Sequence, residues 1–207
     1  MTIKKQLITS GRNRWLDVGC GGNFEDGFDY IDTFPEGLLS EHVRNRYHRL
    51  DIINASDEAL RAMGDFDLVR LQHTFEHFSL EEGQKVLSNC HKLLRSGGII
   101  IITVPDLEVH IRAYLDGTYN ELSDFRNWAL NRIEKDAPDS YYFSIFAHSM
   151  PYESHKWCYD WNGLRHAINM TGLYKDICRL TIDDAMAEVP FTHNRPEEDL
   201  CVIAVKR

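Results

Sequence analysis

The sequence predicts an α/β protein: a mostly parallel sheet with helices packed outside it. An apolar stretch at residues 14–18 runs straight into the glycine-rich residues 19–22. Strand-like and helix-like segments then alternate through the first half of the chain, which is typical of a parallel sheet. Residues 99–104 form a continuous apolar run, as expected of a strand that is covered on both faces.

Apolar periodicity and turn residues place the remaining elements in order. Further strands are expected at residues 28–32, 47–51, 66–71, 99–104, 173–182 and 200–206. Helices are expected at residues 55–63, 80–95 and 162–170. Gly97 and Gly98 follow the second of these helices and predict the left-handed cap that ends it.

A long aromatic segment interrupts the alternation after the fifth strand. Residues 106–161 hold 12 of the 23 aromatic residues of the chain. The segment leaves the carboxyl edge of the sheet, where α/β proteins bind ligands, so we expect it to form a lid or a substrate pocket. An extra helical layer with its own small core is an alternative that is compatible with this role.

The composition is that of one globular domain without a dominant basic face. The 207 residues can bury a sizeable core, and their net charge of −9 argues against nucleic-acid binding, which needs a basic stripe. The sequence shows neither a signal-peptide pattern nor an apolar run long enough for a membrane span, so we expect no membrane partner and a cytoplasmic location. The five cysteines contain no C-x-x-C pair, which favours reduced thiols over a disulfide framework or a zinc ribbon.

The glycine cluster predicts a nucleotide-like ligand at the end of the first strand. Glycine allows a ligand to approach the backbone closely, and Asp32, at the end of the second strand, can accept hydrogen bonds from ribose hydroxyls. A dinucleotide fingerprint needs a third glycine where this chain has Phe24, and a P-loop needs a Lys and a Ser or Thr after the glycines. Neither pattern is present, and a glycine turn without a ligand is the remaining alternative.

The order of motifs resembles that of one enzyme family. The chain has D-V-G-C-G at 17–21, G-F-D-Y-I-D at 27–32, L-D-I at 50–52, F-D-L-V-R-L-Q-H-T-F-E-H-F at 66–78, K-L-L-R-S-G-G-I-I-I-I-T-V-P-D at 92–106 and S-H-K-W-C-Y-D-W-N-G-L at 154–164. This order is similar to that of class I S-adenosylmethionine-dependent methyltransferases, in particular short bacterial and phage members associated with surface-polysaccharide genes. The resemblance is strong over residues 14–104 and weak over 105–207.

The resemblance implies a Rossmann-like sheet of seven mostly parallel strands, with helices on both faces, and the cofactor S-adenosyl-L-methionine. It divides a single domain, residues 1–207, into a cofactor-binding half at 14–104, an acceptor-binding insertion at 105–160 and a closing part at 161–207. The usual helix between the first two strands is reduced to residues 23–27, and the N-terminal helix that often caps the cofactor is not evident in residues 1–13.

The resemblance also implies a set of cofactor contacts. They are Asp17, Gly19, Cys20, Gly21, Asp32, Asp51, Ile52, Gln72 and His73. Asp17 and the backbone at Gly19 and Gly21 would face the methionine part, and Asp32 would hold the ribose hydroxyls. Asp51 and the backbone N–H of Ile52 would contact the adenine, and Gln72 and His73 would line the methionine side. A turn or helix N-cap role is the alternative for Asp51.

Methyl transfer to an alcohol also needs a base. The candidates are His155, His77, His148 and Asp106. We favour His155, because it lies where the aromatic insertion returns to the sheet; a packing role is the alternative for each histidine. The resemblance implies a small-molecule acceptor, such as a sugar or a related metabolite, and leaves the oligomeric state open.

One motif predicts a different class of protein. Residues 73–77, His-Thr-Phe-Glu-His, match the H-x-x-E-H signature of zinc proteases, in which His73 and His77 would bind zinc and Glu76 would act as base. The segment directly follows a strand and no distal acid ligand is obvious, so we expect no bound metal. A third hypothesis is a protein that binds the cofactor without catalysis.

Overall fold

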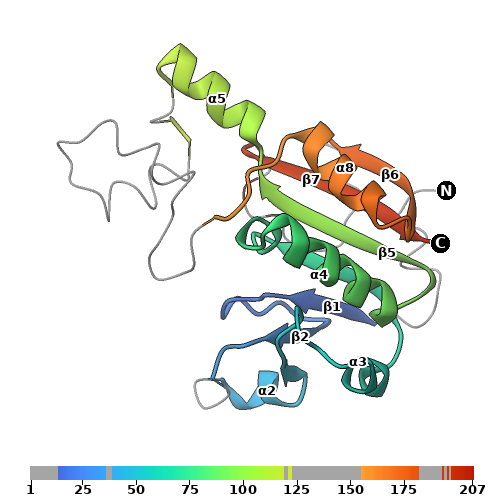
Figure 1. Ribbon diagram of the computed structural model, residues 1–207. Helices are drawn as coiled ribbons and strands as arrows, with labels where there is room; N and C mark the ends of the chain where they lie inside the picture. The colour runs from blue at the N-terminus through green and yellow to red at the C-terminus, as the bar shows by residue number, and fades with distance from the viewer. Residues whose placement is uncertain are drawn as a thin grey trace.

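The computed structural model describes residues 14–35, 39–118, 121–122, 155–181, 193, 195 and 197–207. Seven strands form one sheet in the order β3-β2-β1-β4-β5-β7-β6, and helices pack against it (Figure 1). The pairs among β1 to β5 are parallel, whereas β7 runs antiparallel between β5 and β6. This confirms the predicted seven-stranded, mostly parallel sheet.

Each expected strand and helix overlaps one element of the structure. The strands are β1 (Trp15–Val18), β2 (Phe28–Asp32), β3 (Tyr47–Arg49), β4 (Phe66–Gln72), β5 (Leu94–Pro105), β6 (Tyr174–Leu180) and β7 (Asp199–Lys206). The helices are α2 (Glu41–Arg44), α3 (Asp57–Met63), α4 (Leu80–Leu93), α5 (Leu107–Asp116) and α8 (Trp161–Met170), with one 3₁₀ turn, η2 (Phe75–His77). Residues 19–27 form only turns, which confirms the reduced connection between the first two strands.

The glycine pair after α4 has a different role from the expected helix cap. The helix already ends at Leu93, and the chain continues directly into β5. Gly97 has a φ of 70° and bends the chain at the start of this strand, where the pairing with β4 also shifts register. A Cβ at Gly98 would lie 3.1 Å from the carbonyl oxygen of Phe66. The glycines are therefore needed because β4 and β5 approach closely at this bend.

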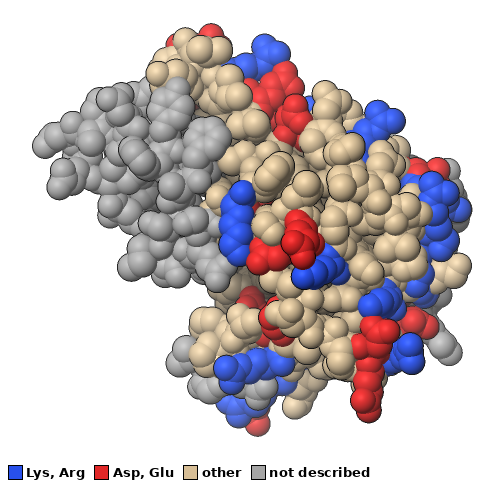
Figure 2. All heavy atoms as spheres, viewed as in Figure 1, with Lys and Arg blue, Asp and Glu red and all other residues tan. Residues whose placement is uncertain are grey.

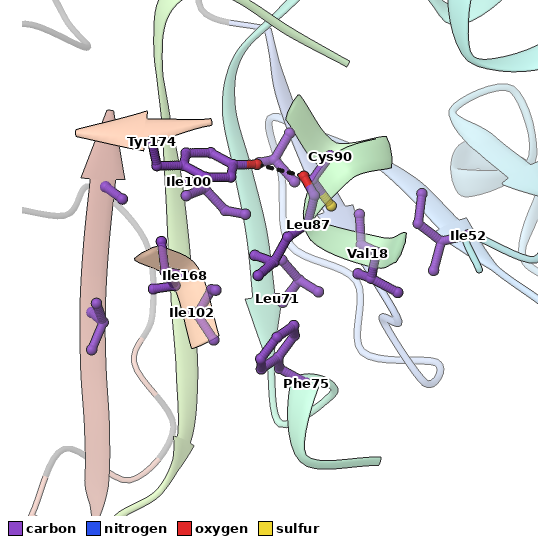
Figure 3. Packing of buried hydrophobic residues seen from close by; sticks show 14 of the residues in the cluster. Val18, Ile52, Leu71, Phe75, Leu87, Cys90, Ile100, Ile102, Ile168 and Tyr174 are labelled. Carbon is purple, nitrogen blue, oxygen red and sulfur yellow. Dashed lines mark hydrogen bonds between the residues drawn. The ribbon is translucent and has the colours of Figure 1, made fainter. Parts of the chain in front are cut away.

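The larger of two hydrophobic clusters packs α3, α4 and α8 against one face of the sheet (Figures 1 and 3). Leu71, Ile100 and Ile102 on the central strands have no exposed surface. The phenol of Tyr174 crosses from β6 and donates a hydrogen bond of 2.8 Å to the carbonyl of Leu87 in α4, as Figure 3 shows. This cluster fixes the central strands β4 and β5, whose carboxyl ends carry the groups described below.

The opposite face carries the second cluster and the short helix α2. Phe28 and Tyr30 of β2, Val43 of α2 and Ile101 of β5 are all buried in it. Helices therefore lie on both faces, as the sequence predicted. On the side of the molecule drawn in Figure 2, basic and acidic side chains are interspersed over the described residues, which is the pattern of a solvated surface.

Several expectations fall on residues that the structure does not describe. They are those about residues 1–13, about most of the aromatic insertion and about His148. The described parts of the insertion are α5 with residues 117–118, residues 121–122 and residues 155–160. Within the described residues, no helix combines the length and the apolar character that a membrane crossing requires.

Candidate functional site

The turn after β1 depends on glycine. Gly19, Gly21 and Gly22 have φ values of 77°, 56° and 91°, a region that other residues rarely adopt. A Cβ at Gly19 would lie 2.3 Å from the side chain of Thr74, whose Oγ1 donates a hydrogen bond of 3.1 Å to the Gly19 carbonyl. A Cβ at Gly22 would meet nothing within 4 Å. The turn is thus packed against the end of β4 on one side and open on the other.

Asp32, at the end of β2, is oriented by three backbone N–H groups. Its Oδ2 accepts from Gly21 at 2.8 Å, and its Oδ1 accepts from Thr33 and Phe34 at 2.6 and 3.2 Å. A carboxylate can accept about four hydrogen bonds, and the fourth here comes from the weak S–H donor of Cys20, which a ligand hydroxyl could displace. Cys20 lies beside it, with Sγ 3.7 Å from Oδ2, and burial raises the pKa of this thiol to about 12.

A pocket of about 260 Å³ opens beside the glycine turn. It is lined by Asp17, Gly19, Cys20, Asn23, Phe24, Glu25, Arg70 and Gln72. Four of the expected cofactor contacts therefore line this one pocket: Asp17, Gly19, Cys20 and Gln72. The Oε1 atom of Gln72 is buried and has no hydrogen-bond partner within the described residues, so this wall of the pocket offers a polar atom to a ligand.

The charge of Asp17 is balanced inside this pocket, which the sequence analysis did not foresee. Arg70 of β4 donates hydrogen bonds to Asp17 at 2.7 Å and to Glu25 at 2.9 Å. Burial raises the pKa of Asp17, and the guanidinium of Arg70 opposes that rise. The signal in the sequence is an arginine in the largely apolar second half of the strand F-D-L-V-R-L, because a buried charge needs a partner.

The structure gives Asp51 the turn geometry that was considered as an alternative. Its carboxylate accepts from the Ile53 N–H at 2.9 Å and from the Asn54 side chain at 2.7 Å. Ile52 packs into the larger cluster near Val18, as Figure 3 shows. Both residues follow β3 at the same edge of the sheet as Asp32, and the exposed Asp51 carboxylate keeps acceptor positions for a further donor.

His73 faces away from the pocket, which corrects the expectation that it lines the methionine side. Its φ of 51° turns the ring toward β7, where Nε2 lies 2.9 Å from the Oδ2 of Asp199. Its Nδ1 lies 3.5 Å from Glu76 Oε1. Burial lowers the pKa of His73, but the charges and hydrogen bonds of Asp199 and Glu76 outweigh it and raise that pKa to about 9.

Two of the four expected base candidates come together next to Glu76. The backbone N–H groups of Lys156 and Trp157 donate to the Glu76 carbonyl at 2.9 and 3.1 Å, so the returning insertion is tied to η2. The rings of His77 and His155 then lie with their centroids 4.9 Å apart and nearly perpendicular. Only the tertiary structure places these three side chains in contact range.

Asp106, the third described candidate, is engaged elsewhere. It caps α5, with Oδ1 accepting from the Glu108 N–H at 3.0 Å, and Oδ2 pairs with Arg179 at 2.6 Å. Burial raises the pKa of Asp106. Because both oxygens have partners and the side chain is fully buried, the structure gives Asp106 the task of fixing α5 at the end of β5.

A small cavity adjoins these groups, with room for about one water-sized occupant. It is lined by Glu76, Pro105, Leu107, His110, His155, Trp157, Cys158 and Tyr159. His110, which is buried on α5, was not expected at the site from the sequence; burial lowers its pKa to about 4, so its imidazole is neutral at pH 7. The sequence signal that could have identified His110 is its position one turn into the helix that follows the fifth strand.

The zinc-protease arrangement does not form. Residues 75–77 make a single 3₁₀ turn, and His73 precedes it in a left-handed conformation. His73 and His77 therefore do not share a helix face, and His73 is already paired with Asp199. This excludes the H-x-x-E-H geometry, in which both histidines bind one zinc ion from consecutive turns of a helix.

Comparisons with known proteins agree with this fold. Residues 16–102, from β1 into β5, match the family model described as "Methyltransferase domain". No curated protein sequence matches the chain.

Similar solved structures include the apo form of the S-adenosylmethionine-dependent methyltransferase SibL, with a TM-score of 0.55 and 16% identity over 99% of this chain and 53% of SibL. An O-methyltransferase family protein from Burkholderia thailandensis has a TM-score of 0.55 and 13% identity, over 99% and 54%. A TehB-like S-adenosylmethionine-dependent methyltransferase from Corynebacterium glutamicum has a TM-score of 0.51 and 14% identity, over 100% and 89%.

The chain thus spans about half the length of the first two of these proteins. At these identities the likeness concerns the fold, and the family match concerns the part of the chain that carries the glycine turn and Asp32. Residues 16–102 therefore match a methyltransferase-domain model over less than half of the chain, and the chain shares its fold with these solved methyltransferase structures.

Proposed function

We propose that this protein transfers a methyl group from S-adenosylmethionine to a small-molecule acceptor, a sugar or a related metabolite. One observation carries the proposal: the pocket at the glycine turn and the histidine-lined cavity flank the end of the same strand, β4. Gln72 lines the first, and Glu76, four residues later, lines the second. In α/β proteins ligands bind at this edge of the sheet.

The residues of the pocket fit the cofactor chemically. Its amino-acid end carries a carboxylate and an ammonium group, and the pocket offers the guanidinium of Arg70 between the carboxylates of Asp17 and Glu25. Asp32, oriented by the turn, offers an acceptor for a ribose hydroxyl. The unpartnered Oε1 of Gln72 offers a further acceptor. Phosphate groups have no such match, because this wall holds two acids for one base.

When bound, S-adenosylmethionine supplies the electrophilic methyl group and leaves as S-adenosylhomocysteine. The chain has to align the acceptor, exclude water and take the acceptor's proton. His155 and His77 lie where the insertion returns to the sheet, beside the cavity that Trp157 and Tyr159 line. The cavity has room for about one water-sized group, so it would admit a hydroxyl of the acceptor, while the rest of the acceptor would lie outside it.

The test is ligand binding followed by turnover. S-adenosylhomocysteine should raise the melting temperature, because a ligand that binds only the folded state stabilises it. NAD should not, since Phe24 replaces the third glycine of its fingerprint. A panel of sugars, phenols and nucleosides should then be screened for formation of S-adenosylhomocysteine.

His155→Ala separates the two halves of the proposal. It should leave the affinity for S-adenosylhomocysteine nearly unchanged, while methyl transfer falls roughly 10²–10⁴-fold if His155 is the base. A shift with NAD but none with S-adenosylhomocysteine would contradict the cofactor assignment. Binding of S-adenosylhomocysteine without turnover on any acceptor would instead favour a non-catalytic binding protein.

A further inference from the structure

We propose that Glu76, His77 and His155 form a binding site for a divalent transition-metal ion beside the cofactor pocket. Each side chain offers one ligand atom, and these three atoms all lie within 4.8 Å of one another. Glu76 and His77 come from η2, and His155 comes from the far end of the insertion. This is a different set from the protease motif, because His155 takes the place of His73.

The cluster contains buried polar atoms that lack partners. Glu76 is 2% exposed, and neither of its carboxylate oxygens has a hydrogen-bond partner within the described residues, apart from the 3.5 Å approach of His73. The Nδ1 atom of His77 is buried and unpartnered as well. A carboxylate removed from water needs compensation by a cation or by several donors. His73 supplies one such group at 3.5 Å from Oε1, and a metal ion between Glu76 and His77 would engage the other carboxylate oxygen.

The backbone holds the three ligands in place without the ion. The 3₁₀ turn fixes Glu76 and His77, and the hydrogen bonds from Lys156 and Trp157 to the Glu76 carbonyl fix the residue next to His155. The ammonium of Lys156 lies on Glu82, at 3.1 Å, and so does not occupy the place of the ion. These backbone contacts help to position Glu76 and the segment that carries His155.

The donor set selects the kind of ion. Two imidazoles and one carboxylate are typical ligands of zinc, iron(II), cobalt(II) and nickel(II), with bonds of about 2.0–2.2 Å to zinc. Tetrahedral bonds of that length separate ligand atoms by about 3.3–3.6 Å, so the most distant pair of ligand atoms, at up to 4.8 Å, would have to approach by up to about 1.2–1.5 Å. Three protein ligands leave coordination positions open, as in catalytic rather than structural sites.

These open positions suggest how the ion would serve methyl transfer, a step that rests on the proposed function. Glu76 and His155 line the small cavity, so an oxygen of the acceptor could complete the coordination. A bound ion lowers the pKa of a hydroxyl that it ligates, so the hydroxyl would release its proton to solvent and present an oxygen nucleophile; His155 would then act as a ligand of the ion and not as the base. The acceptor would then be a hydroxyl compound, and the reaction an O-methylation.

The experiment titrates chelator-treated protein with Zn²⁺ by calorimetry and with Co²⁺ by visible absorption. One equivalent should bind, and His155→Ala and His77→Ala should each weaken binding by at least about 10–100-fold, the loss seen even for outer-shell partners. His166→Ala is the matched control, because His166 is an exposed histidine of α8 outside the cluster and should bind metal normally. Melting curves verify that each variant is folded.

Two results would overturn the ion site: no binding of either metal to the folded protein, or binding that His155→Ala leaves unchanged. Calorimetry with S-adenosylhomocysteine on the same metal-free protein keeps the two proposals apart. If the nucleoside fails to bind while zinc binds, the proposed function fails and the ion site stands. If the nucleoside binds while zinc does not, the ion site fails and the proposed function stands.

Discussion

Replacing Asp32 by Ala removes the carboxylate that we expect to hold the cofactor ribose. In the structure three backbone N–H groups and the weakly donating thiol of Cys20 use this carboxylate, so a ribose hydroxyl would take the position of the thiol. A hydrogen bond to a charged group contributes about 1.5–3 kcal/mol. The affinity for S-adenosylhomocysteine should therefore fall by about 10- to 150-fold.

Calorimetry with S-adenosylhomocysteine measures this loss, and melting curves verify the fold. Asp29→Ala is the matched control, since Asp29 lies on the same strand and its carboxylate makes only a 3.4 Å contact with the exposed Arg14. That variant should keep the wild-type affinity. Asp32→Asn should fall between the two, because the amide keeps one acceptor oxygen but loses the charge.

The outcome that refutes the reasoning is an unchanged affinity in Asp32→Ala, which would mean that the adenosine lies elsewhere. A loss shared equally by the Asp29 control would also refute it, because the effect would then come from β2 as a whole. A loss well above 150-fold would indicate that the hydrogen bond from Gly21 to Asp32 also shapes the glycine turn.

Three further predictions concern stability and reactivity. Arg70→Met leaves the buried Asp17 without its counter-ion and should lower the free energy of unfolding by about 3–5 kcal/mol, measured by urea denaturation. Adding Asp17→Asn should restore much of this stability, and an unchanged free energy of unfolding in Arg70→Met alone would contradict the ion pair. At pH 8, iodoacetamide should label the exposed Cys178 before Cys20, whose pKa burial raises to about 12; peptide mass spectrometry showing the reverse order would disprove this. Tyr174→Phe should cost about 0.5–1.5 kcal/mol, because it removes the hydrogen bond to α4, and an unchanged denaturation midpoint would argue against that bond.

The sequence by itself predicted the sheet, and also the glycine turns and the acid at the carboxyl ends of its strands. Alternating apolar runs and glycine turns are local signals, and local sterics decide where a strand such as β2 ends and where a turn must contain Gly19. The acid at the end of β2 therefore lies where the pattern predicted. The predicted helix cap at residues 97–98 was wrong, because a helix cap and a close approach of two strands both need glycine.

The tertiary structure alone decided which polar groups meet. Arg70 reaches Asp17 because β1 and β4 are neighbours in the sheet. His73 turns toward Asp199 because β4 ends in a left-handed residue near the start of the antiparallel β7. His155 joins Glu76 through backbone hydrogen bonds across a long insertion. Strand order, register and chain return set these contacts, and they depend on residues far apart in the chain, so no local pattern encodes them.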